Sequence, residues 1–321
     1  MLSNRLFLTF CTVAAAWAGA AVRGPVMGFV FDSSTRAIRP MRGVPGAAYL
    51  GVPVVPDVDN ACIAPDGATA LVTRDGQTLL YTSLANTSPA ALPVAGAIAN
   101  ADRCAWSPHG GSVALWSTGG NRAQILAYQS FSFTLSPVID LSRIPGHVEA
   151  LAFDGAELII AASADSSGGI YSVTAVAGPL RLVSASAPSA LALAGSDLYF
   201  ADKKSKQIWQ VRSYASQPLS LLFANDNMTS PIALQVSSDG ARLVAADAGG
   251  QTLIVYEIAA RSEIRSLDLS FAPTALDRFG SPSMFLLTSI SAAPAPSYIL
   301  SDDGVNTVTY FVPGPSDSNQ Q

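Results

Sequence analysis

The segment Leu234-Gln-Val-Ser-Ser-Asp-Gly240, followed by Ala-Arg-Leu-Val-Ala-Ala246, decides the fold because related segments recur along the chain. Each one joins a short apolar strand, a glycine turn and a second apolar strand. The turn glycines lie at intervals of 43, 45, 40, 45 and 40 residues, and they are Gly67, Gly110, Gly155, Gly195, Gly240 and Gly280. A period of about 43 residues is typical of the four-stranded blades of a β-propeller.

The unit around Gly240 shows the four strands that we expect in each blade. Short runs rich in Val, Ile and Leu between Gly, Asp and Ser turns predict an antiparallel meander. After residue 20 the sequence has no convincing helical periodicity over 12 or more residues, so it predicts an all-β protein. The strands predicted for this unit are Ile232–Val236, Arg242–Ala246, Thr252–Ile258 and Glu263–Leu269.

The number of blades depends on the N-terminal region. One period before Gly67, Val26–Asp32 matches the second strand of a blade, with Ala37–Met41 and Ala47–Val52 as third and fourth strands. This pattern predicts seven blades, the first without its innermost strand; the alternative is six blades with an appended N-terminal hairpin. Because ring closure protects sheet edges, we expect the N- and C-terminal strands to share a blade. Asn306–Val312 is the obvious closing strand, although the same register uses it as the outer strand of the last unit.

Composition excludes several classes of protein. Apolar residues make up 49% of the 321 residues and charged residues 13%, so the chain has ample side chain to bury and is not disordered. The net charge of −5, without an extended Lys/Arg cluster, argues against a nucleic-acid partner.

Residues 1–20 have the pattern of a secretory signal peptide, with Arg5, an apolar run at Leu6–Trp17 and a small-residue cleavage site, Ala18-Gly-Ala20. The run is too short to span a bilayer. We therefore expect cleavage after Ala20 and export to the periplasm or the extracellular space. We also expect a mature monomer without a membrane span, with one propeller domain at 21–314 and a flexible tail at 315–321.

The turns Ala-Pro-Asp-Gly67, Ser-Pro-His-Gly110 and Ser-Ser-Asp-Gly240 resemble the Ser-Pro-Asp-Gly repeats of bacterial exported propellers of the TolB-like and YVTN-type families. The sharpest motif occurs in three of six units, and the YVTN tetrapeptide is absent. The resemblance implies the fold and an export route, but no single activity, because propellers host many functions.

Polar residues recur eight positions before three successive turn glycines, as Asp59, Asp102 and His147, with Arg103 and Glu149 nearby. Equivalent positions lie side by side around a ring, so we predict that these five residues form a ligand-binding arc at one mouth of the central channel. Asp59, Asp102 and His147 are also candidate ligands of a divalent cation. The alternative is that they are ordinary polar residues of a solvated mouth. The other three units have Ala187, Ile232 and Ala272 at this level.

Two cysteines remain after signal cleavage. Cys62 lies five residues before its turn glycine and Cys104 six, an offset that points side chains to opposite faces of a strand. Stacked sheets lie about 10 Å apart, whereas a disulfide needs Cα atoms within about 7 Å. We therefore predict that a Cys62–Cys104 disulfide does not form, although an exported chain could oxidise the thiols.

The sequence has no recognisable nucleophile, phosphate-binding, zinc or dinucleotide motif. We therefore expect no cofactor beyond the candidate cation, and a non-catalytic module that binds a protein, a glycan or another small ligand. Two alternatives stay open. One is a metal-assisted lyase or lactonase with its site at Asp59, Asp102 and His147. The other is a cell-envelope scaffold that acts through blade rims and loops such as Ser291–Ser297.

Overall fold

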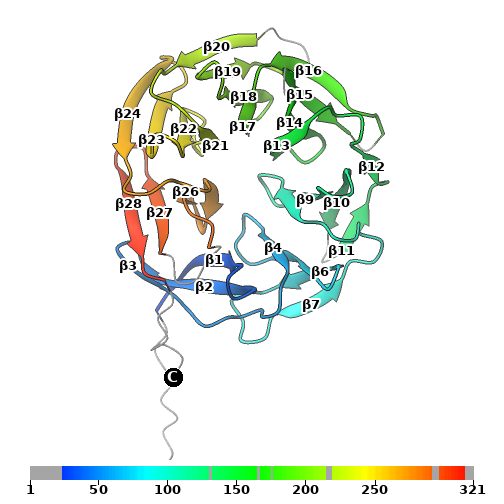
Figure 1. The fold of residues 1–321 in the computed structure, drawn as a ribbon. Helices are drawn as coiled ribbons and strands as arrows, with labels where there is room; N and C mark the ends of the chain where they lie inside the picture. The colour runs from blue at the N-terminus through cyan, green and yellow to red at the C-terminus, as the bar shows by residue number, and fades with distance from the viewer. Residues whose placement is uncertain are drawn as a thin grey trace, which may run out of the picture.

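A computed structural model describes residues 24–129, 132–164, 167–174, 176–214, 219–290 and 296–314. They form seven antiparallel sheets arranged as blades around a ring, the seven-bladed propeller that the repeat predicts (Figure 1). The predicted signal peptide and C-terminal tail lie outside the described residues. So do residues 291–295 of the predicted scaffold loop. No helix in the described part of the chain is long and apolar enough to cross a membrane.

In blades 2 to 7 the strands follow one another outward, so that the first strand of each of these blades is innermost (Figure 1). Blades 1 to 3 contain β1 Val26–Asp32, β2 Ala37–Val44 and β3 Ala47–Leu50; β4 Asn60–Ile63, β5 Ala70–Arg74, β6 Gln77–Thr82 and β7 Ala90–Pro93; β8 Arg103–Trp106, β9 Ser112–Ser117, β10 Arg122–Gln129, β11 Ser132–Leu135 and the short β12 Ile139–Asp140.

Blades 4 to 7 each contain four strands. They are β13 His147–Phe153, β14 Leu158–Ala164, β15 Ser167–Val173 and β16 Leu180–Ala185; β17 Pro188–Ala194, β18 Asp197–Asp202, β19 Gln207–Val211 and β20 Leu219–Ala224; β21 Pro231–Val236, β22 Arg242–Asp247, β23 Thr252–Glu257 and β24 Ser262–Asp268; β25 Asp277–Phe279, β26 Ser281–Leu286, β27 Ser297–Asp302 and β28 Thr307–Val312. The strands of blade 6 agree with the predicted ones to within two residues.

Ring closure differs from the expectation that terminal strands share a blade. Blade 1 has three described strands, and β28 is the outer strand of blade 7. Ile290, from the connection between β26 and β27, bridges to Asp32 at the end of β1, and its carbonyl accepts the Ser33 N–H at 2.9 Å. Ala187 and Ser230, just before the innermost strands of blades 5 and 6, make the equivalent bond. A connection inside blade 7 therefore supplies the contact expected from a terminal strand.

The core lies between neighbouring blades. Leu71 and Leu80 of blade 2 pack with Val113, Leu115 and Leu126 of blade 3, and each side chain is at most 2% exposed. Comparable clusters fill the other seams, so burial of apolar surface holds the ring together and leaves its two faces to loops.

Candidate ligand-binding face

The innermost strands all begin at one face of the ring, here called the mouth face. Asp59 directly precedes β4, Asp102 directly precedes β8, and His147 is the first residue of β13. The strands that follow in blades 2 and 3 run antiparallel and end at the same face, at Arg74 and Ser117.

The two aspartates have equivalent roles in their own blades. One Asp59 oxygen accepts the Asp75 N–H at 2.7 Å, and the other pairs with Arg36 of blade 1. One Asp102 oxygen accepts the Thr118 N–H at 2.9 Å. Both carboxylates thus fasten the start of the innermost strand to the end of the next strand.

The other three candidates have separate surroundings. Glu149 accepts a hydrogen bond from the Ser163 hydroxyl and lies 3.9 Å from the Lys203 ammonium of blade 5. The Arg103 guanidinium lies 5.7 Å from the centre of the Trp116 ring, while His147 is exposed. Within the described ranges, no three His, Cys, Asp or Glu side chains group as ligands of a metal ion. Asp59, Asp102 and His147 therefore lie at one face without forming a metal centre in the structure.

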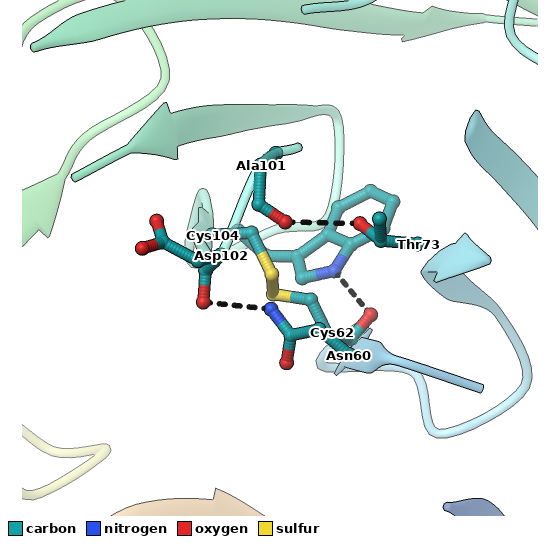
Figure 2. Close-up of a disulfide and its surroundings, with 7 residues drawn as sticks. Asn60, Cys62, Thr73, Ala101, Asp102 and Cys104 are labelled. Carbon is teal, nitrogen blue, oxygen red and sulfur yellow. Dashed lines mark hydrogen bonds between the residues drawn. A yellow bond between two sulfur atoms is a disulfide. The ribbon is translucent and has the colours of Figure 1, made fainter. Parts of the chain in front are cut away.

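The prediction that Cys62 and Cys104 remain unpaired is wrong. The structure joins them by a disulfide between β4 and β8, with the Cα atoms 6.0 Å apart (Figure 2). Equivalent positions in successive blades point the same way around the ring, so two cysteines in the same register could not face each other. The one-residue offset turns Cys104 back toward blade 2, and innermost strands approach more closely than the spacing of stacked sheets.

Further bonds between blades 2 and 3 surround this disulfide (Figure 2). The Asn60 side-chain amide donates to the Asp102 carbonyl at 2.8 Å, and the Thr73 hydroxyl donates to the Ala101 carbonyl at 3.0 Å. The Trp106 indole donates to the Cys62 carbonyl at 3.0 Å. The segment that carries Asp102 is therefore fastened to blade 2 on both sides of that residue.

A pocket of about 700 Å³ opens beside Asp102, between blade 3 and the connection that joins blade 2 to it. Its polar side chains include Asp102, Arg122 and Ser117, and Val138 adds an apolar wall. The rest of the lining comes from residues 96–100 and from Gly119 and Gly120. A pocket of this volume is within the usual range for small-molecule sites.

Sequence reasoning identified Asp102 but missed Ser117, Arg122 and the two glycines. The sequence that could have identified them is Ser117-Thr-Gly-Gly-Asn-Arg122. It occupies the same place between strands as Asp202-Lys-Lys-Ser-Lys-Gln207, but this equivalence appears only when the strand ends are aligned.

No family model and no curated protein matches the chain. Solved structures do match. A Lactobacillus plantarum protein has a TM-score of 0.62 and 13% identity, covering 90% of this chain and 95% of its own. A candidate 6-phosphogluconolactonase from Bacteroides fragilis has a TM-score of 0.60 and 12% identity, covering 89% and 92%. A functionally unknown protein from Desulfotomaculum acetoxidans has a TM-score of 0.61 and 14% identity, covering 88% and 95%.

Identities this low show the fold alone. The chain is a seven-bladed β-propeller, and its structural neighbours include candidate 6-phosphogluconolactonases. The resemblance to the specific TolB-like and YVTN-type repeat families stays a prediction.

Proposed function

We propose that this protein is an exported, non-catalytic binding module that takes a small polar ligand at the mouth face. The observation that carries the proposal is the pocket of about 700 Å³ beside Asp102 in blade 3. It places a carboxylate, Asp102, and a guanidinium, Arg122, around one concave space. A few polar groups in a preformed pocket are what orient a small ligand.

The surroundings of the pocket support preorganised binding. The Cys62–Cys104 disulfide and the bonds from Asn60 and Thr73 fix the segment that carries Asp102. A site that is already ordered loses less conformational entropy when the ligand binds.

Export is supported by two independent features, the N-terminal signal pattern and the disulfide. Disulfides persist mainly in oxidising compartments. N-terminal sequencing of protein from a cell-envelope or culture fraction should begin at Ala21. A chain that stays in the cytoplasm with Met1 and free thiols would contradict this part of the proposal.

Ligand-observed NMR with neutral monosaccharides, uronic acids, amino acids and dipeptides tests the binding role. We expect at least one class to bind, and binding to weaken at least tenfold in Asp102→Ala or Arg122→Ala. Asp226→Ala, on the far side of the same face, and Arg261→Ala are matched controls that should bind normally. The proposal would be overturned if no class of compound binds. It would also be overturned if the affinity is unchanged in both Asp102→Ala and Arg122→Ala.

A further inference from the structure

Four loops of the mouth face share one backbone geometry. Each has four residues between two paired strand ends, and the last of the four has a positive φ between 46° and 55°. The paired ends are Asp32 and Ala37, Ser117 and Arg122, Asp202 and Gln207, and Asp247 and Thr252. The first position is therefore an aspartate in blades 1, 5 and 6 and a serine in blade 3.

Blade 5 shows what the aspartate does. The Asp202 carboxylate, 3% exposed, accepts the N–H groups of Lys204 and Ser205 in its own loop at 3.0 and 3.1 Å. It also accepts the N–H groups of Ser186 and Ala187, just before the innermost strand, at 2.7 and 3.1 Å. Four backbone donors thus converge on one carboxylate.

Blade 6 repeats this arrangement with a different loop sequence. The fully buried Asp247 accepts the N–H groups of Thr229 and Ser230 before the innermost strand, and that of Gly250 in its loop, at 2.5 to 3.1 Å. The convergence of N–H groups therefore belongs to the backbone geometry and not to one loop sequence.

In blade 3, strand register assigns the four corresponding N–H groups to Asn100, Ala101, Gly119 and Gly120. Three of these residues, Asn100, Gly119 and Gly120, line the pocket of about 700 Å³. Within the described part of the chain, Asn100 alone among them has a backbone acceptor, the Gly76 carbonyl at 3.5 Å. Ser117 is a shorter side chain with a single oxygen, so the pocket includes the space that a carboxylate fills in blades 5 and 6.

We propose that this pocket binds the carboxylate of a ligand, which takes the place of the aspartate that blade 3 lacks. Converging backbone N–H groups form an anion site, and hydrogen bonds to an ionised carboxylate are among the strong ones. Arg122 adds a positive charge at the pocket wall. This inference rests on the proposed function and names its ligand class.

The acidic groups nearby narrow that class. One Asp102 oxygen already accepts the Thr118 N–H, and its second oxygen accepts no hydrogen bond from the described residues. That oxygen suits a ligand hydroxyl. Asp140 lies near Arg122. Hydrogen bonds from Ser142, and to a smaller extent the charges of Arg143 and Arg122, hold the pKa of the Asp140 carboxyl below its ordinary value. A small hydroxycarboxylate, such as a uronic acid, satisfies the donors and Asp102 together.

The test compares D-glucuronate with D-glucuronamide, its neutral isostere, by NMR titration of the ¹⁵N-labelled protein. We expect glucuronate to bind at least tenfold more tightly and to shift the amide signals of Gly119 and Gly120. Ser117→Asp should lose glucuronate binding at least tenfold, because its own carboxylate would occupy the donors. Thr118→Asp adds the same charge to the exposed surface of the loop and should change the affinity less than threefold.

Each of three results would overturn the inference. They are equal binding of glucuronate and glucuronamide, undiminished binding to a folded Ser117→Asp variant, and no response to glucuronate. A neutral compound of the wider panel that still binds at Asp102 and Arg122 would leave the proposed function intact while excluding the carboxylate. Failure of the whole panel would reject both.

Discussion

The loops of blades 5 and 3 on the mouth face have the same length and a positive φ at their fourth residue, but their N–H groups have different partners. In blade 5, Asp202 joins the loop to the segment before the innermost strand, and the assembly is closed. In blade 3, Ser117 is too short to accept the corresponding loop N–H groups, those of Gly119 and Gly120, and both glycines line a pocket. The comparison indicates that the side chain at the first position of the loop decides what the loop N–H groups do. An aspartate binds them within the blade, whereas a serine leaves them available to a ligand.

Blade 3 obtains its rigidity from its neighbour. The segment before β8 has one carboxylate bond within its own blade, from the Thr118 N–H to Asp102, and it is fastened sideways to blade 2 through Thr73, Asn60 and the disulfide. The disulfide and the bonds from Asn60 and Thr73 hold the pocket wall from the side of blade 2. They therefore stabilise the wall without filling the pocket.

The largest effect should come from removing the lateral joint. A Cys62→Ser/Cys104→Ser double variant should unfold with a free energy lower by about 3 kcal/mol, since the disulfide closes a loop of 42 residues. Urea unfolding with and without reductant measures the loss. A wild-type protein as stable with reductant as without it would contradict the lateral joint.

A comparable loss should follow from giving blade 5 the residue of blade 3. Asp202→Ser leaves four N–H groups without their carboxylate and should destabilise the protein by about 2–3 kcal/mol. Urea unfolding checks it, with Lys204→Ala as a control that keeps every backbone N–H. A loss below about 0.5 kcal/mol would show that the joint is not structural.

The reverse exchange should stabilise. Ser117→Asp places a carboxylate beneath donors that have little to bond with and should raise the free energy of unfolding by about 1 kcal/mol. Thermal and urea unfolding measure the gain against Thr118→Asp, whose carboxylate stays exposed. A destabilised Ser117→Asp variant would mean that the blade 3 loop is built differently.

Blade 1 gives the smallest effect and sharpens the comparison through pH. Burial raises the pKa of Asp32, but hydrogen bonds from Ser34, Thr35 and Arg39 outweigh it, so the pKa lies below the ordinary value. A carboxyl with a lowered folded pKa contributes stability that is present above its unfolded pKa and is lost as the pH falls through the folded pKa. Melting temperatures between pH 2 and 6 should fall less steeply in Asp32→Asn than in wild type, and equal slopes would contradict this.

The repeat predicted the fold because turn glycines and alternating apolar strands are local features. Gly240 and its equivalents fixed the period, and blade 6 emerged with nearly correct bounds. The Cys62–Cys104 pairing was missed because it depends on the direction in which side chains point around the ring. The pocket was missed because Ser117 is informative only beside Asp202 and Asp247, once the loops are aligned by strand pairing.

The most direct test of the central claim is a crystal structure of the Ser117→Asp variant. The comparison of blades 5 and 3 predicts that the introduced carboxylate lies within hydrogen-bond distance of the N–H groups of Gly119 and Gly120 and of at least one of Asn100 and Ala101. A carboxylate that points into solvent, or a loop whose N–H groups face away from it, would contradict the claim that blade 3 holds an anion site.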